Sequence, residues 1–211
     1  MTITEEIVCA VAAVEASNDP FRHFVLTNVW SESTYANFIV QLPPPAVYQQ
    51  FKHLDSTYEG KGTRNHLWLD DGINRIPAKS RPFWSEIATA LSSPELQYLM
   101  FRKLQVPASV EATARPLLVR DTDGYKINPH PDTPKKVVTV QFYLPADDSR
   151  PHLGTELYRR DGQSFTAVNQ VPFRPHYGYA FRVTKESWHG VPRRDLSAGA
   201  RDSLMVLYYR S

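Results

Sequence analysis

Two patterns of apolar and polar residues divide the chain. In the first 114 residues, apolar side chains recur mostly at helical spacing, as Ile7, Val11 and Val14 do after Thr4, the expected N-cap. Three further helices are expected to begin near Ser31, Pro82 and Pro94. An amphipathic stripe usually covers a core, so we predict that these helices pack on a sheet.

From about residue 115 the pattern changes to short apolar and aromatic runs, separated by turn signals such as Asp123-Gly124 and Asp161-Gly162. Runs of this length and spacing are typical of all-β domains. We predict eight strands: Arg115–Arg120, Tyr125–His130, Lys136–Leu144, Thr155–Arg159, Phe165–Val171, Tyr177–Thr184, Ser187–Val191 and Arg201–Tyr209.

Helices followed by eight short strands predict an α+β fold: a double-stranded β-helix (jelly roll) of about eight strands, buttressed by N-terminal helices. The chain has 211 residues, and we find no internal repeat and no low-complexity linker. We therefore expect residues 1–211 to form a single domain, with 1–114 as mostly helical support and 115–211 as the jelly-roll core.

Composition limits the classes of protein to consider. The chain is 42% apolar and 22% charged, which argues against disorder. No apolar run approaches the roughly 20 residues of a membrane span, and the N-terminus lacks a basic region followed by an apolar stretch. We expect a soluble, cytoplasmic protein without a membrane partner. The net charge of only +2 gives no reason to expect a nucleic-acid partner.

The single cysteine, Cys9, restricts the metal chemistry. It excludes an internal disulfide framework, a zinc ribbon and any iron–sulfur cluster that needs several thiolates from one chain. We expect Cys9 to be a small buried apolar residue. The seven histidines still permit a metal site built from nitrogen and oxygen ligands.

One group of residues has the composition of such a site. His130-Pro131-Asp132 places an imidazole and a carboxylate two residues apart, so both face the same side of an extended backbone. His189 follows on a different predicted strand. Two histidines and one carboxylate on one face of a metal is the arrangement of non-haem Fe(II) oxygenases, which leaves positions open for co-substrate and oxygen. Taken singly, each residue also fits a role in a loop or a core.

A second feature lies at the start of the last predicted strand. Strand alternation places Arg201, Ser203, Met205, Leu207 and Tyr209 on one face. The planar guanidinium of arginine binds a carboxylate through two parallel hydrogen bonds, and a hydroxyl two residues on can add a third. A solvent-exposed arginine at the start of a strand is the alternative interpretation of Arg201.

The order of these pieces resembles the Fe(II)/2-oxoglutarate-dependent dioxygenase superfamily, and the prolyl-hydroxylase-like branch is the most similar group. The resemblance covers roughly residues 115 to 210. It is carried by five segments in order: Tyr125 to Asp132, Val138 to Leu144, Gly154-Thr155-Glu156-Leu157, Trp188-His189-Gly190-Val191 and Arg201-Asp202-Ser203-Leu204.

The resemblance implies Fe(II), 2-oxoglutarate as co-substrate, and O2. It implies that His130, Asp132 and His189 are the iron ligands, and that Arg201, assisted by Ser203, binds the distal carboxylate of 2-oxoglutarate. No catalytic residue is expected beyond the metal centre, because metal and co-substrate carry the chemistry.

Three further residues are weaker candidates for the co-substrate site. Tyr143 occupies a place where relatives often use a tyrosine to bond the same carboxylate, although it fits a core aromatic equally well. Tyr125 and Asn128, just upstream of His130, are candidates for lining the site.

The implied activity is hydroxylation of an unactivated C–H bond of a small molecule or biosynthetic intermediate, with decarboxylation of 2-oxoglutarate to succinate. Halogenating relatives replace the carboxylate ligand with a small residue, so the intact Asp132 disfavours halogenation. Desaturation and cyclisation remain open, as does the oligomeric state.

The substrate is less well indicated. Arg120, Arg64 and Trp68 are candidate substrate contacts, and the two arginines suit an anionic substrate. The short chain has no obvious appended recognition domain, which favours a small molecule. A peptidyl or protein hydroxylase of the prolyl type would share the whole site. A metal-binding cupin-type non-oxidative enzyme would not need Arg201 and Ser203, and a β-sandwich binding module would not need the metal ligands.

Overall fold

The computed structural model describes residues 1–51, 58–59, 62–193, 195–197 and 199–211. It contains four α-helices: α1 (Ile3–Ala13), α2 (Glu32–Val40), α3 (Arg81–Leu91) and α4 (Pro94–Lys103). Short 3-10 turns occupy Pro45–Val47, Ile73–Arg75 and Pro151–Leu153. All four helices were expected, and their ends follow from the capping residues.

Helix α1 begins earlier than the sequence suggested. Thr2, not Thr4, is the N-cap, because its side chain accepts a hydrogen bond from the Glu5 amide while the Glu5 carboxylate accepts one from the Thr2 amide. Ser31 and Ser93 cap α2 and α4 in the expected way, each through its hydroxyl. The N-cap of α3 is Ser80, so Pro82 lies in its first turn.

The structure confirms all eight strands predicted after residue 115, with small shifts at their ends. The strands in chain order are β1 (His23–Leu26), β2 (Gln49–Gln50), β3 (Tyr58–Glu59), β4 (Arg64–Trp68), β5 (Ala112–Asp121), β6 (Lys126–His130), β7 (Lys136–Tyr143), β8 (Thr155–Asp161), β9 (Ser164–Val171), β10 (Gly178–Arg182), β11 (His189–Val191) and β12 (Arg201–Arg210). Residues 1–114, expected to be mostly helical, also contribute the first four of these strands.

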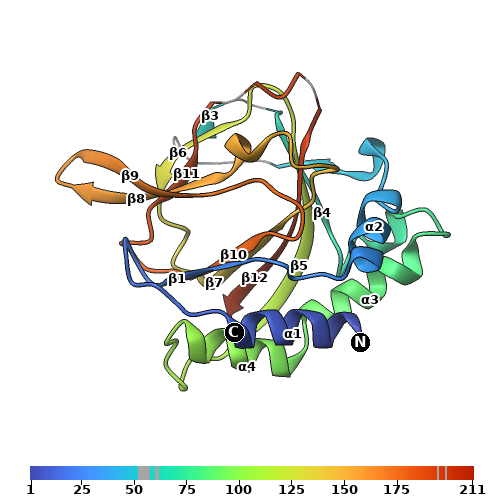
Figure 1. Ribbon diagram of the computed structural model, residues 1–211, viewed down its shortest axis with the longest axis horizontal. Coiled ribbons are helices and arrows are strands. Elements are labelled where there is room, and N and C mark those ends of the chain that lie inside the picture. The colour runs from blue at the N-terminus through green and yellow to red at the C-terminus, as the bar shows by residue number, and fades with distance from the viewer. Residues whose placement is uncertain (52–57, 60–61, 194, 198) are drawn as a thin grey trace.

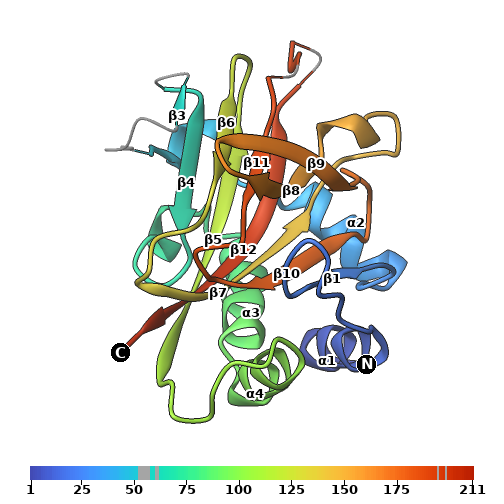
Figure 2. The same cartoon turned by 90° about the vertical axis from the view of Figure 1, so that its left-hand side faces the viewer.

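The strands form two antiparallel sheets (Figures 1 and 2). The order of the seven-stranded sheet is β1-β10-β7-β12-β5-β4-β2, and that of the five-stranded sheet is β3-β6-β11-β8-β9. From β5 onward the chain contributes four strands to each sheet, in the order of a jelly roll. The predicted α+β jelly roll with helical buttresses is confirmed.

The main core lies between the helices and the outer face of the seven-stranded sheet. Helix α1 packs against α3 and α4, and Figure 1 shows these three helices below the strands. Leu204, Val206 and Tyr208 of β12 face this core, as does Leu118 of β5. The intervening residues of β5 and β12 therefore face the five-stranded sheet, where the site is built.

One expectation drawn from composition is wrong. Cys9 is exposed, not buried, because it lies on the outer side of α1, away from the buried Ile7 and Val11. Among the described residues, no helix has both the length and the apolar character needed to cross a bilayer.

An ion pair on the outer face of the seven-stranded sheet holds a buried carboxyl group. Asp202 of β12 lies opposite Arg120 of β5, with 3.3 Å between a carboxylate oxygen and a guanidinium nitrogen. Asp202 is only 8% exposed. Burial raises its pKa to about 6, and the neighbouring Asp121 adds to the rise, although Arg120 opposes it.

The raised pKa gives a test of this packing. A folded-state pKa above the unfolded value contributes stability at low pH that is lost as pH rises through about 6. The side chain of the Asp202→Asn variant cannot ionise. The unfolding free energy of the variant minus that of the native protein should therefore increase by about 2 kcal/mol from pH 4 to pH 7. Urea denaturation of both proteins at the two pH values measures this difference. A difference that stays constant would contradict the assignment.

Candidate active site

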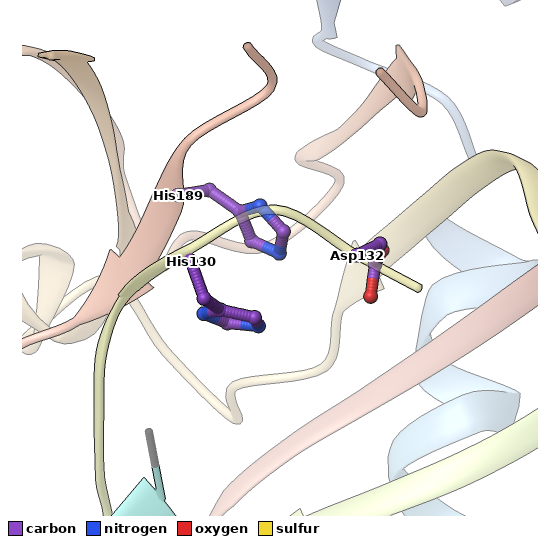
Figure 3. A group of neighbouring side chains, drawn as sticks. All are labelled: His130, Asp132 and His189. Carbon is purple, nitrogen blue, oxygen red and sulfur yellow. The ribbon is translucent and has the colours of Figure 1, made fainter. Parts of the chain in front are cut away.

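The pairing of β6 with β11 brings two histidines together. His189 is the direct partner of His130 in the antiparallel register, and their ring centroids are 4.6 Å apart. Asp132 lies two residues beyond the end of β6. One ligand atom from each of the three residues lies within 4.8 Å of the others, and Figure 3 shows the three side chains converging on one space. The structure thus assembles the three predicted metal ligands.

Backbone carbonyl groups orient both imidazoles. Nδ1 of His130 lies 2.9 Å from the carbonyl oxygen of Asn128, and Nδ1 of His189 lies 3.0 Å from that of Ser187. If each Nδ1 donates to its carbonyl oxygen, Nε2 is left with its lone pair for a metal. Burial lowers the pKa of His130 and lowers that of His189 to about 4, so both rings are neutral at neutral pH.

The carboxylate is held by two neighbours on β7. The Lys136 ammonium lies 2.5 Å from Oδ1 of Asp132, and the Thr139 hydroxyl donates to Oδ2 at 2.6 Å. Burial alone would raise the pKa of Asp132, but Lys136, His189 and these hydrogen bonds hold it well below its usual range. Two neutral imidazoles and one ionised carboxylate, without a thiolate, are a donor set that suits Fe(II).

The ligands open into a cavity of about 240 Å³ between the two sheets. Its wall is polar on one part and apolar on another. The polar part carries Arg201, Arg64, Tyr125, Gln141, Thr155 and Tyr179. The apolar part carries Phe51, Leu117, Val119, Met205 and Leu207. The three candidate metal ligands and Arg201, which are far apart in the sequence, therefore line the same cavity.

Arg201 is almost completely buried, with an exposed fraction of 1%. Its Nε donates to the carbonyl oxygen of Leu153 at 2.7 Å, and its two Nη atoms donate to Asp121 at 2.8 Å and to Thr155 at 3.0 Å. A guanidinium has five N–H groups, so two are left over from the bonds formed within the described part of the chain. This is enough for a bidentate bond to one carboxylate. The alternative of an exposed arginine is wrong.

The most important residue that the sequence did not indicate is Asp121. It is fully buried at the end of β5, between Arg64 of β4 and Arg201 of β12. Its carboxylate oxygens lie 3.3 Å from Nε of Arg64 and 2.8 Å from Nη1 of Arg201. Asp121 therefore provides the negative charge that allows two arginines to be buried beside the cavity.

Thr155 is the second such residue, and the glycine before it fixes its place. A Cβ on Gly154 would lie 1.8 Å from the carbonyl oxygen of Val171, so only glycine fits there. This close approach of β8 to the end of β9 places Thr155 between Arg201 and the hydroxyl groups of Tyr143 and Tyr179.

Ser203 and Tyr143 lie behind the cavity wall. The Ser203 hydroxyl accepts a hydrogen bond from the Gln141 amide at 2.8 Å. The Tyr143 hydroxyl bonds both the amide and the hydroxyl of Thr155, and its ring packs 5.1 Å from the Arg201 guanidinium. Neither is among the cavity-lining residues, so both act on the cavity through Gln141, Thr155 and Arg201.

Tyr125 and Asn128 differ in their positions. Tyr125 lines the cavity, and the Arg64 guanidinium donates to its hydroxyl and packs 4.9 Å from its ring centroid. Asn128 contributes its backbone carbonyl oxygen to the orientation of His130.

The three candidate substrate residues are not brought together. Arg64 lines the cavity, bonded to Asp121 and Tyr125. Arg120 pairs with Asp202 on the outer face of the sheet. Trp68 packs against Arg115, whose guanidinium carbon lies 4.2 Å from the centroid of the Trp68 ring. Of these three candidates, only Arg64 lines the cavity.

Comparison with known proteins identifies the fold. No protein-family model matches the chain, and no curated protein matches its sequence. A prolyl hydroxylase from Trichoplax adhaerens, in complex with a hypoxia inducible factor oxygen degradation domain peptide fragment, is similar in structure. It is 13% identical with a TM-score of 0.61, and the alignment covers 99% of this chain and 89% of that one.

Two further solved structures are also similar over almost the whole chain. A prolyl-4-hydroxylase from Pseudomonas putida has 15% identity and a TM-score of 0.57, covering 99% of both chains. A non-heme alpha-ketoglutarate-dependent carbocyclase from nogalamycin biosynthesis has 13% identity and a TM-score of 0.56, covering 100% of this chain and 86% of that one. The resemblance to 2-oxoglutarate/Fe(II) oxygenases and their prolyl-hydroxylase-like branch is confirmed for the fold.

The buried charges beside the cavity give a prediction. Asp121→Asn removes the counter-charge of the buried Arg201 and the half-buried Arg64, so the unfolding free energy should fall by about 3 kcal/mol. Asp71→Asn is the matched control, because Asp71 also pairs with an arginine but is 71% exposed. Its variant should unfold at the same urea concentration as the native protein. Equal effects of the two substitutions would show that Asp121 does not neutralise the arginines.

Proposed function

We propose that this protein is an Fe(II)/2-oxoglutarate-dependent oxygenase that hydroxylates an unactivated C–H bond of a small molecule or biosynthetic intermediate. One observation carries the proposal: the three candidate metal ligands and the buried Arg201 line the same cavity. The ligands are His130, Asp132 and His189. A metal site alone has many uses. A metal site that shares a narrow cavity with a buried guanidinium suits a carboxylate-bearing co-substrate.

Each part of the proposed site has a defined task. His130, Asp132 and His189 would hold Fe(II) at the wall of the cavity, where co-substrate and O2 could reach it. Arg201 binds the distal carboxylate of 2-oxoglutarate with its two remaining N–H groups, while Leu153, Asp121 and Thr155 fix the plane of the guanidinium. Bound iron and co-substrate together supply the oxidising chemistry, in which O2 is consumed and 2-oxoglutarate is converted to succinate and carbon dioxide.

The chain's own contribution is to orient the groups of the site. Tyr143 and Ser203 do not touch the cavity and therefore act as positioning residues, through Thr155 and Gln141 respectively. Lys136 and Thr139 keep the Asp132 carboxylate ionised and aimed at the histidines. No side chain has to act as a general base in this reaction.

A prolyl-type peptidyl hydroxylase is the second candidate, since two of the similar structures are prolyl hydroxylases, one of them bound to a peptide. It would use the same metal and co-substrate sites. A cupin-type non-oxidative enzyme is less well supported, because its chemistry gives no reason to bury Arg201 beside the metal ligands.

Metal and co-substrate binding can be tested without knowing the substrate. Anaerobic addition of Fe(II) and then 2-oxoglutarate should produce a weak visible charge-transfer band, and aerobic incubation should release succinate slowly. His130→Ala should abolish the band, because iron would lose one of three protein ligands. A native protein that gives neither band nor succinate would refute the proposed function.

The role of Arg201 needs a separate variant. Arg201→Leu should weaken 2-oxoglutarate binding about 100-fold, the effect of losing a bidentate charged hydrogen bond, while iron still binds. Arg120→Leu is the matched control, because Arg120 lies on the opposite face of the same strand pair. Titration of the charge-transfer band measures both. If Arg201→Leu fails to fold, Arg201→Gln serves instead, and unchanged affinity in a folded variant would contradict the role.

A further inference from the structure

The part of the cavity next to the metal ligands has a continuous apolar wall. Leu117 and Val119 of β5 and Met205 and Leu207 of β12 all line the cavity. Leu117 is the direct cross-strand partner of Met205. These four residues form a hydrophobic cluster of their own, separate from the core beneath the helices.

Core packing against the helices does not account for this wall. The alternate residues of the same strands, Leu118, Leu204 and Val206, face the helices and make the main core. Leu117, Val119, Met205 and Leu207 point the other way, into a space that also contains the metal ligands. These four side chains are at most 9% exposed, and whatever apolar surface they present to water in the cavity costs about 25 cal/mol for each Å², which an apolar ligand would remove.

The charged side chains at the cavity are three cations, Arg64, Arg201 and Lys136, and two carboxylates, Asp121 and Asp132, so the distal carboxylate of the proposed co-substrate would complete the balance. Arg64 and Arg201 share Asp121, and Lys136 pairs with Asp132. Arg201 has donors left, but the proposed function assigns them to the co-substrate. Arg120, the other arginine considered for an anionic substrate, lies outside the cavity. A second anion would therefore enter without a dedicated partner among the described residues and would lose its hydration.

We propose that the substrate presents an uncharged apolar group, alkyl or aromatic, to the wall of Leu117, Val119, Met205 and Leu207. The proposal rests on the proposed function and names the substrate class of that site. The cavity of about 240 Å³ is smaller than the roughly 300–1,000 Å³ of most small-molecule pockets. With co-substrate bound, only the reacting end of the substrate enters, and its polar or charged parts stay outside.

Three probes of similar shape and different charge test this selectivity: benzyl alcohol, benzoate and benzylamine. They are titrated by ligand-observed NMR into protein loaded with Zn(II) and 2-oxoglutarate, so that no turnover occurs and Arg201 is occupied. Benzyl alcohol should bind about tenfold more tightly than either ion. Benzoate or benzylamine binding as tightly as benzyl alcohol would overturn the proposal.

Two variants of Met205 test whether benzyl alcohol binds against the apolar wall. Met205→Leu keeps the position apolar, whereas Met205→Gln makes it polar at nearly the same volume. The glutamine variant should weaken benzyl alcohol binding about fivefold, and the leucine variant should leave it within about twofold. Circular dichroism shows whether both variants fold. Equal affinities in the two variants would contradict the assigned wall.

The same titration in protein without metal or co-substrate separates this proposal from the proposed function. If the charge-transfer band is absent but benzyl alcohol binds and the Met205→Gln effect persists, the proposed function fails and the apolar subsite stands. If the band is present but the probes are bound without selectivity, the oxygenase assignment stands and the apolar subsite is refuted.

Discussion

The antiparallel register between β6 and β11 is the constraint on which the site depends. It sets His189 directly opposite His130, and the chain then needs only two more residues to bring Asp132 beside them. A shift of β11 by one residue would turn His189 to the other face of the sheet. The short strand β11 pairs with β6 on one side and with β8 on the other, so the hydrogen bonds between strands fix the positions of His130 and His189.

The rest of the site reflects a second constraint: a charged side chain that is buried between the two sheets needs a partner of opposite charge. Arg201 can be buried because Asp121 lies on the neighbouring strand, and Asp132 stays ionised because Lys136 and Thr139 lie on β7. Three of the five N–H groups of Arg201 are used within the described part of the chain, so two are left for a ligand in the cavity. Leu117, Val119, Met205 and Leu207 line another part of the same cavity, so the proposed co-substrate and substrate would meet surfaces of different polarity.

Residues close together along one strand were predictable from the sequence, and contacts between strands were not. The spacing of His130 and Asp132 and the alternation along β12 follow from local geometry. Asp121 falls in a turn-like Asp-Thr-Asp-Gly stretch, and its role depends on two strand registers that no local pattern specifies. Thr155 and Tyr179 were missed for the same reason, and no local pattern indicates that Arg120 pairs with Asp202, which is on another strand.

The most direct test of the central claim is a crystal structure grown without oxygen in the presence of Fe(II) and 2-oxoglutarate, with data collected at the iron absorption edge. We expect one anomalous peak bonded to His130, Asp132 and His189, and a 2-oxoglutarate carboxylate on the Arg201 guanidinium. An iron peak on other residues, or a co-substrate bound away from Arg201, would contradict the claim that the two sites form one centre.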